Sequence, residues 1–171
     1  MAHRSPLRLL LLTLLVPLLG IAGPRNCPWR AALYQLQPES AVTRGCFDPC
    51  DCLTQSPQPV EGVFVMIEVS GQDAAPFREF AIPALRWRTR IDGEEVSIAG
   101  SGSYRVGGEF AQLQQLELDL QIGSSPEQHF DSGLVVGGGE FPKLDVSISV
   151  NGGFCFDTVI DVVAQPIVSR F

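Results

Sequence analysis

Apolar and polar residues alternate with a period of two along most of the chain after residue 61. This period is typical of β-strands with one buried and one solvated face. No stretch has the period of about 3.6 residues that marks an amphipathic helix. Glycine-rich turns separate the alternating segments. Residues 62–171 are therefore predicted to form an antiparallel β domain.

The clearest strand pair lies on either side of Asp92-Gly93, a dipeptide that strongly favours a two-residue hairpin turn. Such a turn pairs Arg90 with Glu95 on the solvated face and Trp87 with Ile98 on the apolar face. Apolar residues then oppose apolar residues, and opposite charges meet. The register of this hairpin is therefore predicted residue by residue.

Gly107-Gly108 marks the next turn and predicts pairing of Tyr104 with Ala111. With this pairing Leu113 points inward, and strict alternation from Leu113 would turn Leu116 outward. We expect a β-bulge at Gln114-Gln115 to restore it. With the bulge in place, one inner row is formed by Leu116, Leu118, Leu120 and Ile122.

Three further strands complete the predicted meander. Two inner rows are expected, one of Phe130, Ser132, Leu134 and Val136 and one of Leu144, Val146, Ile148 and Val150. A three-residue loop at Asn151–Gly153 is preferred, because a two-residue turn places Phe154 on the wrong face. The last inner row is then Phe154, Phe156, Thr158, Ile160 and Val162, which leaves Cys155, Asp157 and Asp161 outside.

Two earlier segments also read as strands. One is Ala32–Leu36, and the other is Val63–Val69, which is apolar on both faces and predicts a covered, central strand. The total is about eight strands. A meander with one apolar face must close on itself or be covered by another sheet. We expect an all-β fold, an up-and-down barrel or half-barrel, with a two-sheet sandwich as the alternative.

Residues 1–22 predict a secretion signal. A basic start with Arg4 and Arg8 precedes an apolar run from Leu9 to Leu19, and Gly20 and Ala22 are the small residues expected at a cleavage site. The apolar run is too short to favour a membrane span, for which ~20 residues are needed. The protein is therefore expected to be exported: secreted, periplasmic or at the cell surface.

Size and charge narrow the function classes. Removal of 22 of the 171 residues leaves about 149, enough for one domain with a core. We divide the chain into the signal peptide at 1–22, a Cys- and Pro-rich segment at 23–61 packed on the domain, and the β domain at 62–171.

The net charge of −7 argues against binding of nucleic acid through net charge. No membrane span is expected after signal cleavage.

Five cysteines are the strongest local feature: Cys27, Cys46, Cys50, Cys52 and Cys155. An exported chain normally oxidises its thiols. We expect a disulfide from Cys155 to the 46–52 cluster, and a second from Cys27 to another cluster member. One cysteine is left over, and the sequence does not decide which.

A metal site is the alternative use of the cluster, because the thiolates of Cys46, Cys50 and Cys52 are suitable ligands for zinc or cuprous copper. The spacing lacks the second Cys-x-x-Cys-like half of usual zinc sites. No cofactor is expected.

Several side chains have catalytic chemistry, but none is assigned a catalytic role. His129 and Asp131 share one face of a strand while Ser132 points away, so this segment alone does not make a triad. Two carboxylate pairs of the glycosidase type, Glu117 with Asp119 and Asp157 with Asp161, read as the solvated side of a sheet.

Two groups of residues suit binding. Arg86, Arg88 and Arg90 form an outward ladder that could bind a polyanion or a carboxylate partner, although ordinary solvated ion pairs are the preferred interpretation. The interior of a barrel offers a place for a small apolar ligand, with a lining expected from Trp87, Tyr104, Phe154 and Phe156.

The motif Tyr34-x-Leu36, followed by Gly45-Cys46-Phe47-Asp48-Pro49-Cys50-Asp51-Cys52, resembles the start of certain uncharacterised exported bacterial β-proteins. Residues 100–104 and 129–133 resemble the same group. The resemblance implies a bacterial exported β-protein and brings no activity or functional residue with it.

The main hypothesis is an exported, non-enzymatic binding or structural domain, stapled by disulfides, whose partner is a small apolar ligand or another protein. The first alternative is a hydrolase acting outside the cytoplasm, which would depend on His129. The second alternative is metal binding through the cysteine cluster.

Overall fold

The computed structural model describes residues 31–53, 55–69, 76–137 and 140–170. The expected signal peptide and Cys27 lie outside these residues. No helix in the described part of the chain is long and apolar enough to cross a membrane. The strands are β1 (Ala31–Leu36), β2 (Ala41–Cys46), β3 (Gln58–Pro59), β4 (Glu61–Glu68), β5 (Phe77–Ile91), β6 (Glu94–Gly107), β7 (Leu113–Ile122), β8 (Gln128–Asp131), β9 (Val135–Val136), β10 (Leu144–Ser149) and β11 (Phe156–Arg170).

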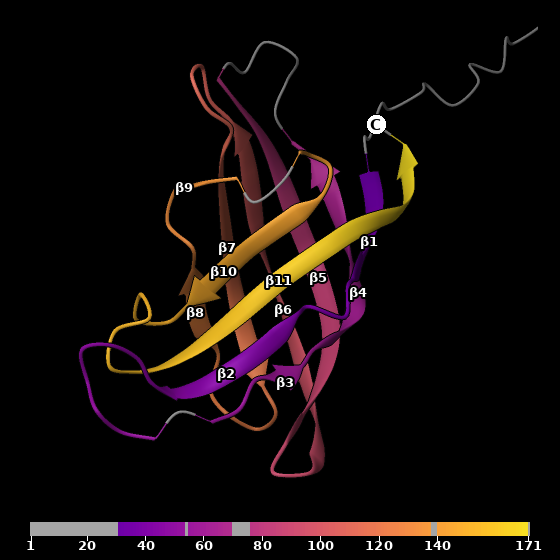
Figure 1. Cartoon of the computed structure of the whole chain (residues 1–171). Coiled ribbons are helices and arrows are strands. Elements are labelled where there is room, and N and C mark those ends of the chain that lie inside the picture. The colour runs from indigo at the N-terminus through magenta and orange to yellow at the C-terminus, as the bar shows by residue number, and fades with distance from the viewer. Residues whose placement is uncertain (1–30, 54, 70–75, 138–139, 171) are drawn as a thin grey trace, which may run out of the picture.

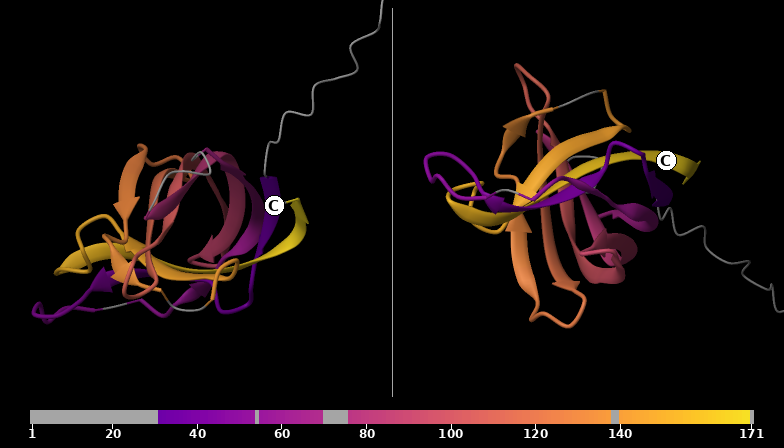
Figure 2. Two further views of the ribbon diagram at one scale, coloured as in Figure 1. Left: turned by 90° about the horizontal axis from the view of Figure 1, so that it is seen from above. Right: turned by 60° about the horizontal axis from the view of Figure 1, so that its bottom comes forward.

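All eleven strands belong to one antiparallel sheet, and eight of them close into a ring. The ring runs β1-β4-β5-β6-β7-β8-β10-β11 and closes where β11 pairs with β1. Seen from above, the strands curve round a common centre (Figure 2). The predicted all-β antiparallel meander is confirmed, and the single sheet excludes the two-sheet sandwich for the described residues.

β11, a long strand near the C-terminus, pairs with strands from both the N-terminal and the C-terminal part of the chain (Figure 1). Its first half pairs with β2 on one side and β10 on the other, and its second half pairs with β1. β2 and β1 therefore lie end to end along β11. Residues 31–61, which we expected to pack on the sheet, instead supply β1, β2 and β3 to the sheet itself.

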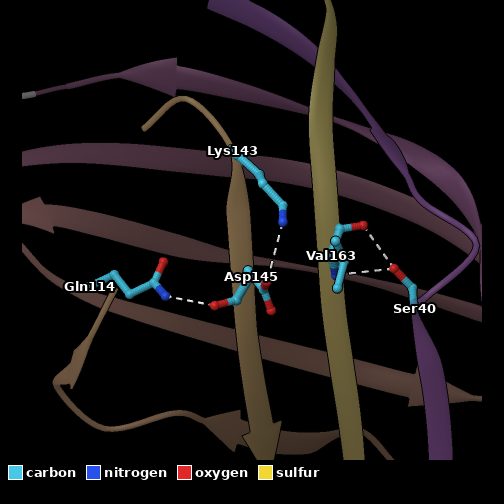
Figure 3. Close-up of polar contacts among 5 residues, drawn as sticks. All are labelled: Ser40, Gln114, Lys143, Asp145 and Val163. Carbon is cyan, nitrogen blue, oxygen red and sulfur yellow. Dashed lines mark hydrogen bonds and ion pairs between the residues drawn. The ribbon is translucent and has the colours of Figure 1, made fainter. Parts of the chain in front are cut away.

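Ser40 joins β11 to the chain at the break between β1 and β2. Its hydroxyl donates to the carbonyl of Val163 at 2.8 Å and accepts from the Val163 N–H at 3.0 Å (Figure 3). Ser40 is 1% exposed. The Val163 carbonyl also accepts from the Gln37 N–H at 2.7 Å, so the buried hydroxyl adds to one backbone bond and satisfies the Val163 N–H where the strand is interrupted.

The interior of the ring is filled by side chains. Tyr34 stacks on Phe64 with ring centroids 5.4 Å apart, and Phe64 meets Trp87 edge-on at 5.8 Å. Phe141, from the loop before β10, packs against Phe80 and Tyr104. These aromatic contacts connect the inner faces of β1, β4, β5 and β6 to the loop before β10.

The predicted hairpin at Asp92-Gly93 is confirmed in full. Arg90 pairs with Glu95 and Trp87 with Ile98, and both turn residues have positive φ. The alternation of apolar and polar residues and the turn chemistry agree at this point, so the register has a single solution.

The predicted bulge at Gln114-Gln115 is wrong. β6 and β7 pair without interruption, with Tyr104 opposite Leu116 rather than Ala111. The loop from 108 to 112 is longer than a two-residue turn and absorbs the change of parity. Gln114 therefore points inward, is 2% exposed, and donates through Nε2 to the Asp145 carbonyl at 2.7 Å (Figure 3).

The structure also corrects the last part of the meander. β8 ends at Asp131, so Leu134 and Val136, expected inside, are exposed. The connection from β10 to β11 is longer than Asn151–Gly153, because Ser149 pairs with Val159. As a result Phe154 and Phe156 lie outside the core, at 56% and 74% exposure.

Val63–Val69 is likewise not covered on both faces. Phe64 and Met66 are buried inside the ring, whereas Val63 and Val69 on the outer face are 41% and 57% exposed. The sequence alternation of this strand was hidden because apolar residues occupy its solvated face as well. Val63 contributes to the cavity described next.

Candidate functional site

A surface cavity of about 760 Å³ lies where the pairing of β1 with β4 stops. The β1–β4 ladder ends at Gln35 opposite Val63, and pairing resumes between β2 and β3 at Ala41 opposite Pro59. The chain between Gln35 and Ala41 has two residues more than the chain facing it, so the strands separate there. We call this the β1–β4 cavity, lined by Gln35, Leu36, Gln37, Pro38, Pro59, Val60, Glu61, Gly62, Val63, Arg86, Trp87 and Arg88.

Gly62 and Trp87 are neighbours in the lining of this cavity. They are opposite each other in the β4–β5 ladder, and Gly62 has a φ of 150°, which favours glycine. A Cβ on Gly62 would lie 2.7 Å from Cδ1 of Trp87. The absence of a side chain therefore lets the pyrrole edge of the indole ring lie against the β4 backbone at the cavity.

Trp87 has an unusual polar atom. Its side chain is 3% exposed, and its Nε1 has no hydrogen-bond partner among the described residues. An indole N–H can only donate, and a buried donor without an acceptor costs about 1–3 kcal/mol. Most such groups in proteins are satisfied, and among the described residues only the Tyr34 hydroxyl and Arg44 Nε share this property with Trp87 Nε1.

The arginine ladder forms the outer wall of the cavity. Arg88 contacts Glu61 at 3.1 Å, an exposed ion pair. Arg86 is exposed and is flanked across the sheet by Val63 and Ala99, which are both uncharged. It makes no hydrogen bond or ion pair within the described part of the chain. Arg90, farther along the same face, does not line the cavity.

This arrangement supplies hydrogen-bond donors, and the carboxylate in its lining, Glu61, is paired with Arg88. Trp87 offers an N–H and Arg86 a guanidinium, which donates paired hydrogen bonds to planar anions. Leu36, Pro38 and Val60 add apolar surface beside them. The chemistry suits recognition of a hydrogen-bond acceptor attached to an apolar group.

A second group of polar residues lies on the outer face of β7 and β8. His129 Nδ1 is 2.8 Å from Asp119 Oδ1, and this hydrogen bond raises the pKa of His129 above its ordinary value. The His129 side chain is 60% exposed. The sequence placed these two residues in separate candidate groups, and the pairing of β7 with β8 brings them together.

The other candidate catalytic residues are occupied. Ser132 Oγ donates to the Gly133 carbonyl and accepts from the Leu116 N–H. Asp157, expected outside, is 3% exposed and accepts backbone N–H groups of Asn151, Gly153 and Thr158. The predicted pairing of Asp157 and Asp161 as an outer-face carboxylate pair is therefore wrong, because Asp157 holds the β10–β11 loop.

Glu117 and Asp119, the other carboxylate pair, also have partners of their own. Glu117 Oε1 accepts from Gln115 Nε2 at 2.6 Å, and Asp119 holds His129. Gln115 Nε2 donates to Asp131 as well, at 2.9 Å. These acids form part of a solvated hydrogen-bond network across β7 and β8.

Both disulfides involve the cysteine cluster. Cys50 is bonded to Cys155 and Cys46 to Cys52, with sequence separations of 105 and 6. The predicted staple to Cys155 is confirmed, although Cys155 lies just before β11 rather than on its outer face. The expected bond from Cys27 to a cluster member stays a prediction, because Cys27 lies outside the described residues.

The cysteine pairing also bears on metal binding. A disulfide sulfur is not a thiolate, so Cys46, Cys50 and Cys52 do not supply the ligand set considered for zinc or copper. The described residues contain no group of three or more His, Cys, Asp or Glu side chains arranged to hold a metal ion.

The four residues expected to line a ligand site lie in three different places. Trp87 lines the β1–β4 cavity, Tyr104 lies in the filled core with its hydroxyl on Gln114 at 3.1 Å, and Phe154 and Phe156 are on the surface. Gly62 and the strand break near Pro38 were missed. Pro38 was the available sequence signal, because a proline disfavours a continuous ladder.

Comparison with known proteins adds no name to these features: no protein-family model, no curated protein and no solved structure matches the chain.

Proposed function

We propose that the protein is an exported, non-enzymatic binding domain that takes a small ligand in the β1–β4 cavity. The observation that carries the proposal is Trp87, which lines the cavity and whose buried indole nitrogen has no acceptor among the described residues. A cavity of about 760 Å³ lies within the usual range of ~300–1,000 Å³ for small-molecule sites.

Export is supported by two independent features. The first 22 residues have the pattern of a secretion signal. The two disulfides suit an oxidising compartment outside the cytoplasm. A domain stapled in this way resists unfolding, which suits a binding protein that works outside the cell's chaperone system.

The location of the ligand follows from the packing. The ring interior is occupied by large side chains, including Tyr34, Phe64, Phe80 and Phe130, each at most 3% exposed. The proposed ligand therefore binds at the break in the wall and not in the ring centre.

A thermal-shift screen of small molecules against the secreted protein tests the proposal. We expect hits whose Tm shift is lost in Trp87→Phe, which removes the N–H and keeps an aromatic ring, and in Val63→Phe, which fills the cavity from the exposed side. Val65→Phe is the matched control, because Val65 lies on the same face of β4 outside the cavity lining. Hits that survive both cavity variants would contradict the site.

A hydrolase is the second candidate, favoured by the 2.8 Å contact between His129 and Asp119. A carboxylate on Nδ1 leaves Nε2 as the base of a triad-like arrangement. Ser149 lines the same hollow of about 620 Å³ as His129. Turnover of p-nitrophenyl acetate that falls in both His129→Gln and Ser149→Ala would support this candidate, and equal rates in all three proteins would remove it.

A further inference from the structure

We propose that the ligand of the β1–β4 cavity is an organic carboxylate with an apolar body. This inference rests on the proposed function and adds the chemical class of the ligand. It is argued from the charges that face the cavity, from its apolar lining and from the donors it holds.

The charges facing the cavity leave one cation uncompensated. The charged residues of the lining are Glu61, Arg86 and Arg88. Glu61 and Arg88 are joined at 3.1 Å, so their charges offset each other. Arg86 has no ionic partner in the described part of the chain, and its cross-strand neighbours are Val63 and Ala99.

The donors and the apolar surface specify the rest. Guanidinium binds a carboxylate through two parallel N–H groups, and such charge-assisted bonds are about twice as strong as neutral ones. Trp87, the next residue of β5, points to the inner face of the sheet, and its buried Nε1 has no acceptor among the described residues. Leu36, Pro38 and Val60 provide apolar surface for the remainder of the ligand. A bare inorganic anion would leave this apolar surface unused.

Isothermal titration calorimetry at low salt tests the inference with phenylacetate and its uncharged isostere phenylacetamide. We expect phenylacetate to bind at least about tenfold more tightly, because the charge-assisted pair with Arg86 is absent from the amide complex. Equal affinities, or binding of neither probe, would overturn the carboxylate class.

Substitutions at three exposed residues test whether phenylacetate binds at Arg86. Arg86→Gln should weaken phenylacetate binding about tenfold, while Arg90→Gln, on the same face of β5 but outside the lining, should change it less than about twofold. Glu61→Gln releases Arg88 from its ion pair and should tighten binding, a gain that misfolding does not produce. Equal losses in the two arginine variants, or a loss in Glu61→Gln, would overturn the inference.

The two proposals fail in different ways. Neutral hits in the thermal-shift screen that depend on Trp87 and Val63, together with no binding of phenylacetate, would remove the carboxylate class and leave the binding site. An absence of any cavity-dependent hit and of phenylacetate binding would remove both.

Discussion

Removal of the Cys50–Cys155 disulfide should destabilise the domain far more than removal of Cys46–Cys52. The two bonds share one loop cluster but close loops of very different length, with sequence separations of 105 and 6. In the chain-entropy description, a disulfide stabilises by restricting the unfolded chain, and the restriction grows with loop length. The comparison therefore isolates loop length while the chemistry stays the same.

The loop lengths set the expected magnitudes. For a separation of 105 the restriction of the unfolded chain is worth about 4.8 kcal/mol. For a separation of 6 it is worth about 2.2 kcal/mol. A domain of this size is typically stable by ~5–15 kcal/mol, so loss of the longer bond removes a large part of the total.

The assay is urea unfolding of the double variants Cys50→Ala/Cys155→Ala and Cys46→Ala/Cys52→Ala, each in a Cys27→Ser background to prevent thiol exchange. We expect the free energy of unfolding to fall by about 4–5 kcal/mol in the first and about 2 kcal/mol in the second. An equal loss in the two variants, or a larger one without Cys46–Cys52, would refute the reasoning from loop length.

Three further outcomes follow from the hydrogen bonds. Ser40→Ala leaves a buried backbone N–H of β11 unpaired and should cost about 1–3 kcal/mol in urea unfolding; no change would show that the hydroxyl is dispensable. Gln114→Leu removes the hydrogen-bond partner of the Tyr104 hydroxyl and of the Asp145 carbonyl in β10, and should lower the free energy of unfolding by about 2 kcal/mol in the same assay. Asp119→Asn should lower the pKa of His129 in an NMR titration, and an unchanged pKa would contradict the assigned hydrogen bond. Because that pKa is raised by folding, the pair stabilises the wild type below pH ~6.5, and this contribution is lost as pH rises through the folded pKa.

The sequence was sufficient where two independent patterns agreed. At Asp92-Gly93 the turn dipeptide and the alternation of inner and outer residues require the same register, and the structure has that register. At Gln114 they did not agree, because a two-residue turn at Gly107-Gly108 places Leu113 inside whereas the alternation places Leu116 inside, and a bulge was predicted to reconcile them. The buried amide instead bonds Tyr104 and Asp145, contacts that come from distant strands and leave no local trace in the sequence.

The candidate site was only partly predictable for the same reason. Trp87 was expected to line the interior of a barrel, and the arginine ladder was interpreted mainly as solvated ion pairs, with anion binding as the alternative. The cavity itself depends on the two extra residues between Gln35 and Ala41, which become visible only when β1 and β2 are paired with β4 and β3. Phe154 and Phe156 were misplaced because the β10–β11 connection is held by Asp157, a long-range role that spacing alone does not reveal.

The most direct test of the binding site is the indole N–H signal of Trp87 in a ¹H–¹⁵N NMR spectrum. A Trp29→Phe variant leaves Trp87 as the sole tryptophan of the 171-residue chain. Added phenylacetate should shift this indole signal and the backbone amides of Gln35, Gly62 and Val63, because the indole nitrogen acquires an acceptor. An indole signal that stays in place at saturating phenylacetate, or shifts confined to other strands, would contradict a carboxylate at the β1–β4 cavity.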